Sequence, residues 1–234
     1  MAPTYEWTAP ETTATSASER GAFIKRTYGH LLGAVLGFVL VELLMFKLGL
    51  AEGMVRAVAA NRVLLWLFVG GFLLVSWFAT RVVVRSASLP MQYLALGAYV
   101  VFEAVLFVPI LWVANTYAPG AITSAGLITV LGFAGLTAIA FTLGTDFSFL
   151  RGLVRWGFFC AFLAIVAALI FGFELGTWFS VIMVALAGAA ILKDTSDVLL
   201  HLPSDRHVFG ALKLFSSVAI MFLYVLDILL RQRR

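Results

Sequence analysis

Long apolar stretches alternate along the chain with short segments of charged and turn-forming residues. Each stretch is long enough to cross a hydrocarbon layer of roughly 30 Å as a helix that rises about 1.5 Å per residue. The predicted spans cover residues 28–46, 63–80, 91–113, 121–143, 152–172, 178–200 and 208–230. The short connections favour antiparallel neighbours. The pattern therefore predicts an all-α integral membrane protein, a seven-transmembrane-helix bundle.

The first twenty residues differ from the rest because they are rich in Thr, Ser, Ala and Glu and contain no apolar stretch. They lack the apolar region of a signal peptide and the hydrophobic content needed for a packed core. We expect a disordered N-terminal leader over residues 1–20 and a seven-helix transmembrane domain over residues 21–234.

Composition supports this assignment, since 62% of the 234 residues are hydrophobic and only 12% are charged, whereas a soluble domain carries about 25% charged residues. The mean hydropathy of +1.04 also indicates a membrane protein. The net charge of +4 comes from Lys and Arg between the apolar stretches, which points to lipid headgroups rather than nucleic acid as the partner. A small excess of these residues on the N-terminal side predicts a cytoplasmic N-terminus.

Small residues in the spans suggest how the helices pack. Gly29, Gly33 and Gly37 recur every four residues in the first span, which predicts a stripe where another helix approaches closely. Pro109 removes one helical hydrogen bond and predicts a kink in the third span. The single cysteine, Cys160, excludes an internal disulfide, and we expect it to be buried.

Charged side chains inside a span cost roughly 2.5–3.5 kcal/mol each on insertion scales, so those present face the bundle interior, pair or line a path. These residues are Glu42, Glu103, Lys193, Asp194, Asp197, Lys213 and Asp227. Glu103 lies near the middle of its span, where it must be protonated, paired or hydrated. A functional role and a structural hydrogen bond are both open for it. For Glu42 and Asp227 we expect structural roles, with Arg231 pairing Asp227.

Two aspartates and a lysine form the densest charged group of the sixth span. Asp194 and Asp197 share one helical face, and Lys193 can pair with Asp197 at the i+4 position, which would leave Asp194 to find a partner on another helix. Carboxylate sites of this kind suit protons or Ca²⁺ rather than zinc or copper. The histidines lie apart near span ends, at His30, His201 and His207. We expect them to be interfacial.

Several segments resemble the transmembrane Bax inhibitor motif family. "ILKDTSDVLLHLPSDRHVFGALKLFSSVAIMFLYVLDILL" is similar to its last two helices, with the Asp-Thr of "KDTSD" as the most specific part. "FIKRTYGHLLGAVLGF", "YVVFEAVLF" and "DFSFLRG" resemble segments of bacterial members. The resemblance implies six helices around a central one in a bacterial inner membrane, and a pH-sensitive Ca²⁺ leak linked to cytoprotection.

The chain departs from that family at two positions. The family has an aspartate pair, thought to share a proton as a latch; Asp194 matches the first member, but the second falls at about Ser217. A hydroxyl of Ser217 or Ser216 donates a hydrogen bond to an ionised carboxylate, so we expect the pH response to be shifted or lost. Asp197 is the nearest replacement partner. Lys193 stands where the family more often has tyrosine, and its charge favours ionised Asp194 and repels Ca²⁺.

The leading hypothesis is a Ca²⁺ or H⁺ leak, with Asp194 as the ion-binding or gating group and Glu103 as a second site in the path. The alternative is a non-conducting regulator that binds other membrane proteins through the glycine stripe. A retinal protein is disfavoured because Lys213 lies too near the end of its span. No span carries a hydrolase motif, so we expect neither an enzyme nor a bound cofactor.

Overall fold

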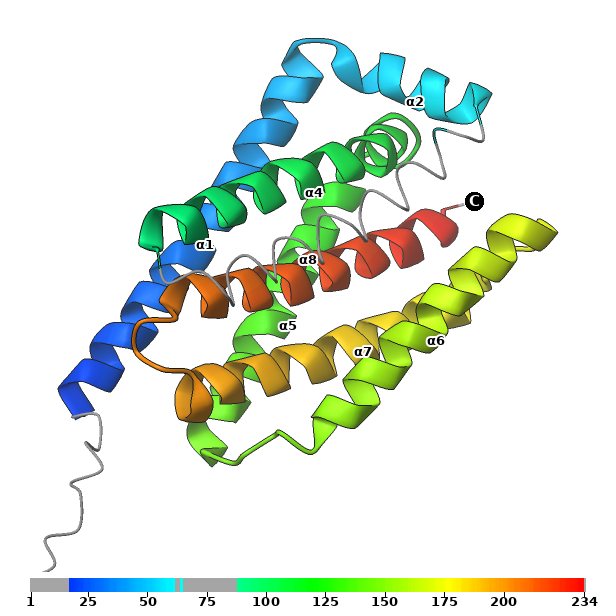
Figure 1. Ribbon diagram of the computed structural model, residues 1–234. Coiled ribbons are helices and arrows are strands. Elements are labelled where there is room, and N and C mark those ends of the chain that lie inside the picture. Colours follow the sequence, from blue (N-terminus) through cyan, green and yellow to red (C-terminus); the bar gives the residue numbers. More distant parts are fainter. Residues whose placement is uncertain (1–16, 62–63, 65–87, 234) are drawn as a thin grey trace, which may run out of the picture.

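The computed structural model describes residues 17–61, 64 and 88–233, and the ordered elements of these residues are all helices. In chain order they are α1 (Ala17–Lys47), α2 (Leu50–Ala60), α4 (Leu89–Tyr117), α5 (Ala121–Leu143), α6 (Leu150–Phe171), α7 (Gly176–Ser196), the π-helical turn η1 (Asp197–His201) and α8 (His207–Arg231). Figure 1 shows their arrangement.

Six of these helices are long and apolar enough to cross a membrane: α1, α4, α5, α6, α7 with η1, and α8. They correspond to six of the predicted spans. The remaining span, 63–80, falls on residue 63 and residues 65–80, which lie outside the described residues, so the seven-span count remains a prediction. The short helix α2 lies in the segment that we expected to be only a connection.

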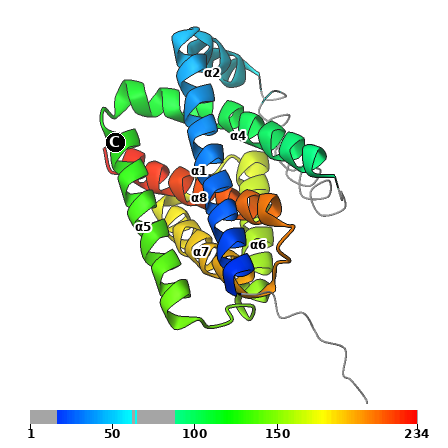
Figure 2. The same cartoon turned by 90° about the vertical axis from the view of Figure 1, so that its left-hand side faces the viewer.

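Helix α8 lies at the centre of the described bundle, in contact with α1, α4, α5 and α7; Figure 2 shows it enclosed by these helices. Its residues Val208, Ala211, Leu214 and Leu226 are fully buried. By contrast, α5 and α6 expose many large apolar side chains, as lipid contact requires. Close approach depends on Gly210, where an added Cβ would lie 2.9 Å from Thr27 Cγ2 and 3.1 Å from Val198 Cγ2.

The structure changes two expectations about individual segments and agrees with a third. The helix α1 already begins at Ala17, so residues 17–20 belong to the helix and not to the leader. Cys160 is exposed on α6 rather than buried, because that helix packs mainly against α7 and leaves its other face free. Pro109 lies inside the continuous helix α4, which changes direction between its two halves (Figures 1 and 2).

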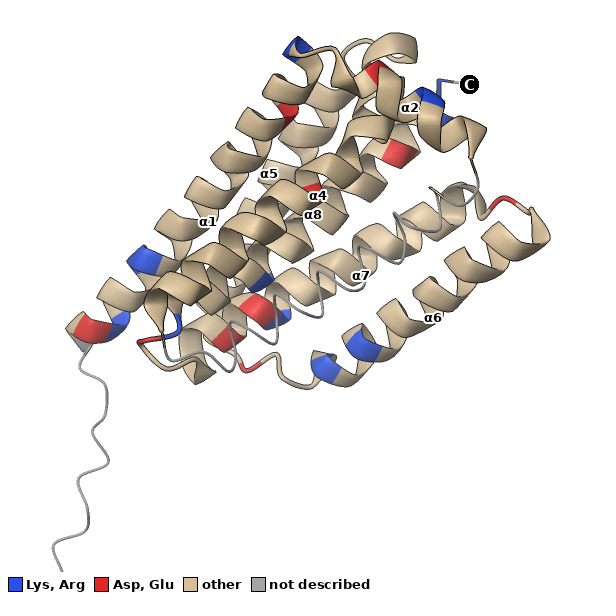
Figure 3. Ribbon diagram, turned by 45° about the horizontal axis from the view of Figure 1, so that its top comes forward, with Lys and Arg blue, Asp and Glu red and all other residues tan. Residues whose placement is uncertain are grey.

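The charged residues of the described chain gather toward the two ends of the helices, as Figure 3 shows. The end of α7 and the start of α8 meet at one of these ends, where residues 202–206 connect them. The start of α1 and the loop between α5 and α6 reach the same end, since Arg20 and Phe147 both contact this part of α7 and η1. This junction brings distant polar residues together.

Candidate functional site

The candidate site lies where α7 passes into η1, and an arginine from α1 holds this junction. The wider π-helical turn leaves backbone carbonyls without the usual helical partners. The guanidinium group of Arg20 donates to three of them, at 2.9 Å to Leu199 O, 2.6 Å to Leu202 O and 2.8 Å to Val198 O. The start of α1 therefore fixes the end of α7, about 180 residues away in sequence.

Asp194 is buried and has three partners. Its Oδ1 lies 2.6 Å from Lys193 Nζ and 3.0 Å from Lys213 Nζ. Its Oδ2 accepts a hydrogen bond of 2.8 Å from Ser217 Oγ. Asp194 therefore contacts Ser217, as predicted. It also contacts Lys213 of α8, which was not predicted.

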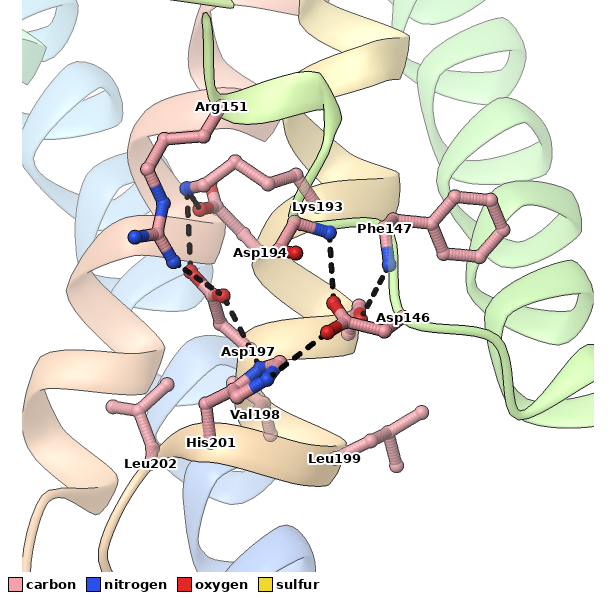
Figure 4. A network of polar contacts seen from close by, with 12 residues as sticks. Asp146, Phe147, Arg151, Lys193, Asp194, Asp197, Val198, Leu199, His201 and Leu202 are labelled. Carbon is pink, nitrogen blue, oxygen red and sulfur yellow. Dashed lines mark hydrogen bonds and ion pairs between the residues drawn. The ribbon is translucent and has the colours of Figure 1, made fainter.

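Asp197 is also buried and shares both lysines with Asp194. Lys193 Nζ lies 3.3 Å from Asp197 Oδ2, and Lys213 Nζ donates to the same oxygen. On the other side Arg151 lies 3.9 Å from Asp197 Oδ1. The predicted Lys193 to Asp197 contact exists, but the expectation of a self-contained pair is wrong, because Lys193 also contacts Asp194. We call Lys193, Asp194, Asp197 and Lys213 the ion-pair cluster; Figure 4 labels the first three of these residues.

The ion-pair cluster continues toward the end of the bundle through His201 and Asp146, which Figure 4 also shows. His201 Nδ1 lies 3.7 Å from Asp197 Oδ1, and His201 Nε2 lies 3.3 Å from Asp146 Oδ2. Asp146 is fully exposed in the loop between α5 and α6, and the backbone N–H of Ser148 lowers its pKa. A chain of polar side chains therefore joins an exposed loop to the buried Asp194.

Two cavities include Lys213 in their lining. One of about 290 Å³ is lined by Asp197, His201 and Lys213 among others, and a second of about 230 Å³ by Asp194, Lys213, Ser217 and Tyr99 among others. Lys213 is common to both. The ion-pair cluster thus stands between a cavity near the loop end and one deeper in the bundle.

Glu103 lies apart from the ion-pair cluster but is linked to it through tyrosine and serine hydroxyls. The Tyr99 hydroxyl interacts with the Glu103 carboxyl group, and it donates a hydrogen bond to Ser216 Oγ at 3.0 Å. Ser216 is the neighbour of Ser217, which contacts Asp194. Glu103 is 2% exposed, and its Oε2 has no hydrogen-bond partner among the described residues. It is the deepest carboxyl group connected to the site.

The remaining sequence-predicted polar residues lie elsewhere. Asp227 accepts hydrogen bonds from Arg231 at 2.7 Å, as expected, and from Ser180 at 2.5 Å. Glu42 is buried in α1, and neither carboxyl oxygen has a partner among the described residues. The expectation that the histidines lie apart is wrong for His30 and His207, whose ring centres are 5.0 Å apart. These groups are distinct from the ion-pair cluster.

The charge of the Asp194 carboxylate is already balanced by protein groups. Ca²⁺ takes about 6–8 oxygen ligands, and the described part of the chain has no group of three or more His, Cys, Asp or Glu residues placed to hold a metal. The two lysines balance the charges of the two aspartates. What the cluster can do chemically is hold a neutral closed contact, release a carboxylate when a lysine moves, and accept protons on its aspartates.

Sequence reasoning missed Lys213, Tyr99, Arg151 and Arg20 as members of the site. Lys213 and Ser217 stand at positions i and i+4 of α8, so a shared helical face was available as a signal. Asp194 and these two residues also lie at similar distances from the turn at 202–206. For Tyr99, Arg151 and Arg20 no local pattern indicates the contact, because their helices are distant in sequence.

Comparison with known proteins gives two matches. The family model Bax1-I, described as "Inhibitor of apoptosis-promoting Bax1", matches residues 20–234. A protein of Pseudomonas aeruginosa with the name "Uncharacterized protein PA2604" is 34% identical over 110 residues. That alignment covers 46% of this chain and 48% of the relative, about half the length of each.

Proposed function

The chain belongs to the Bax1-I family of Bax inhibitor-like transmembrane proteins, and on this premise we propose that it is a gated leak for cations, with Ca²⁺ as the principal permeant ion. One observation carries the proposal: Lys213 bridges Asp194 and Asp197 and lines two cavities. In this proposal the ion-pair cluster is the closed gate. A cation leak of this kind is also the basis for a role in stress or cytoprotection.

In the closed state the ammonium groups of Lys193 and Lys213 contact both aspartates. They therefore exclude a permeant cation from the two carboxylates. A cation entering from the loop-end cavity meets two ammonium groups, and repulsion at short range in a poorly hydrated site is strong. Movement of Lys213 away from α7 exposes the carboxylates of Asp194 and Asp197 to the passing ion. The carboxylates then offset the dehydration of the cation. Glu103 provides the next carboxyl group along the path.

Acidification favours opening in this mechanism. Protonation of Asp194 or Asp197 removes the negative charge that holds the lysines, so the ion pairs weaken as pH falls. In the open state the carboxylates are more weakly paired, so this state binds more protons than the closed state. A fall in pH therefore shifts the equilibrium toward the open state. Ser217 donates a hydrogen bond to Asp194 but has no acidic proton to share with it. Protonation of Asp194 therefore involves no proton shared with a carboxyl group at position 217.

The test is Ca²⁺ entry into proteoliposomes loaded with a Ca²⁺ dye, measured over a series of buffers from about pH 5 to 8. We expect flux that rises on acidification in the wild type. Asp194→Asn should remove most of this pH dependence, and Ser217→Asp should introduce a new pH midpoint. Asp205→Asn is the matched control, because Asp205 is an exposed aspartate of the α7 to α8 connection.

A second series with a pH-sensitive dye distinguishes H⁺ from Ca²⁺ as the permeant ion. Folded, inserted protein that gives no flux of either ion above empty liposomes at any pH would contradict the leak. That result would favour the alternative, a non-conducting regulator that acts by binding other membrane proteins.

A further inference from the structure

A long groove runs between α1 and α4 on the outer side of the bundle, away from the ion-pair cluster. Its volume is about 830 Å³, and its walls are mainly apolar. From one end to the other, its α1 side includes Lys25, Arg26, Gly29, Gly33, Gly37 and Val41. Tyr93, Gly97 and Val101 are among the α4 residues that form the other wall.

Glycines make this groove deep, but they do not bring the two helices into close contact. An added Cβ at Gly29, Gly33 or Gly97 would meet no atom of the described residues within 4 Å, and one at Gly37 would meet Val100 Cγ1 at an ordinary 3.6 Å. Among the described residues, no helix packs against Gly29 or Gly33 as the stripe predicted. Within this described part of the chain, the space beside these two glycines is open. A helix packed against them would fill that space.

One end of the groove is basic. Lys25 and Arg26 are exposed there, and neither forms an ion pair with a carboxylate of the described residues. His30 lies one turn further in, where its Nε2 is 2.9 Å from the Tyr93 hydroxyl. Arg26 also lines a second cavity, together with the carboxylates of Glu19 and Asp205. The mouth of the groove thus presents two cations, at the end of a membrane span, that form no ion pair with another described residue.

We propose that this groove binds an anionic phospholipid, with the phosphate at Lys25 and Arg26 and one acyl chain along the glycine floor. Arginine and lysine are the side chains that bind phosphate, and basic residues at the membrane surface attract anionic lipids. From Lys25 to Val41 the helix rises about 24 Å. This exceeds half of a hydrocarbon layer of roughly 30 Å, so the groove accommodates a chain from headgroup to midplane.

A second copy of the chain fits the groove less well. Copies in one membrane share the same orientation, so a symmetric contact through this face would bring the two basic mouths together. Like charges at that contact would repel. A phospholipid instead supplies the opposite charge at the mouth and an apolar chain beyond it. The site is separate from the ion-pair cluster, so it does not depend on the proposed leak.

The test uses electron paramagnetic resonance of lipids labelled on the acyl chain, with the full chain reconstituted in phosphatidylcholine vesicles. Labelled phosphatidylglycerol and labelled phosphatidylcholine are compared in parallel samples. We expect the wild type to immobilise a severalfold larger fraction of phosphatidylglycerol than of phosphatidylcholine. The double variant Lys25→Gln/Arg26→Gln should lose this preference. Lys47→Gln/Arg155→Gln, which removes the same charge away from the groove, should keep it.

The groove itself is tested with Gly33→Leu, since a Cβ at Gly33 meets no atom of the described residues within 4 Å. It should abolish the preference for phosphatidylglycerol by filling the acyl-chain path. Gly135→Leu on α5 is the matched control, since a Cβ there also meets no atom within 4 Å. Equal immobilisation of both lipids by the wild type would overturn the proposal. So would disulfide-linked dimers through Gly33→Cys in a Cys160→Ala background, because they would identify a second copy as the occupant.

Discussion

Lys213 of α8 places its ammonium nitrogen 3.0 Å from the carboxylate of Asp194 on α7, in a buried site where Asp197 shares the same lysine. The contact holds the two innermost elements of the junction together. It also balances charge, because Lys193 and Lys213 together match the two aspartates. Loss of any one member leaves an uncompensated charge.

Replacement of Lys213 by methionine should therefore destabilise the protein and open the proposed gate. Breaking a buried ion pair on one side costs about 3–5 kcal/mol, and the partial exposure of Lys213 favours the lower end of that range. The free energy of unfolding in mixed micelles measures the first effect, and Ca²⁺ entry at neutral pH measures the second. Lys213→Arg keeps the charge and should retain most of both properties.

The double variant Lys213→Met/Asp197→Asn restores the balance of one lysine with one aspartate. It should recover part of the stability that Lys213→Met loses. A Lys213→Met protein with wild-type stability and wild-type leak would show that the ion-pair cluster is neither a structural contact nor a gate.

Arg20 should stabilise the π-helical turn through geometry as well as charge. Hydrogen bonds that involve a charged group contribute about 1.5–3 kcal/mol each when buried, and because Arg20 is partly exposed we expect a loss of about 2 kcal/mol in total for Arg20→Gln. Arg20→Lys should lose nearly as much, since lysine lacks the planar fork that reaches three carbonyls. Thermal unfolding in detergent measures both. Arg155→Gln serves as the control. A loss of stability in Arg155→Gln as large as that in Arg20→Gln would contradict a specific role for Arg20.

Asp146 should contribute stability only while it is ionised. The Ser148 N–H lowers its pKa, so its contribution is complete above the unfolded pKa of about 3.9 and is lost as pH falls through the folded value. We expect Asp146→Asn to have a lower melting temperature than the wild type near pH 6. The difference should shrink below about pH 4. A difference that stays constant over this range would contradict the assignment.

Gly210 should tolerate no side chain without rearrangement of α1 or η1. The Cβ of Gly210→Ala would lie 2.9 Å from Thr27 Cγ2 and 3.1 Å from Val198 Cγ2, and overpacking of this kind costs about 1–3 kcal/mol. Thr27→Ser removes the nearer methyl group and keeps the hydroxyl, so the double variant should recover stability. Gly135→Ala, with open space at its Cβ, should be as stable as the wild type. Unfolding in detergent distinguishes these outcomes.

The sequence alone determined the class of protein and much of the ion-pair cluster. Apolar length is a local property, so the six described spans could be read from hydropathy. The contact of Asp194 with Ser217 followed from the resemblance to the family, and the contact of Lys193 with Asp197 from helical spacing. These predictions succeeded because each depends on periodicity or on a motif within one or two neighbouring helices.

Only the tertiary structure decided which distant residues complete the site and which surfaces stay open. Arg20 reaches η1, and Tyr99 reaches Ser216, because α1 and α4 both pack on α8. The glycine stripe of α1 illustrates the same limit. Its spacing indicates a smooth helix face, but whether a helix or open space lies against Gly33 depends on how α4 crosses α1. Helix crossing is set by the packing of the whole bundle, and no local pattern along the chain encodes it.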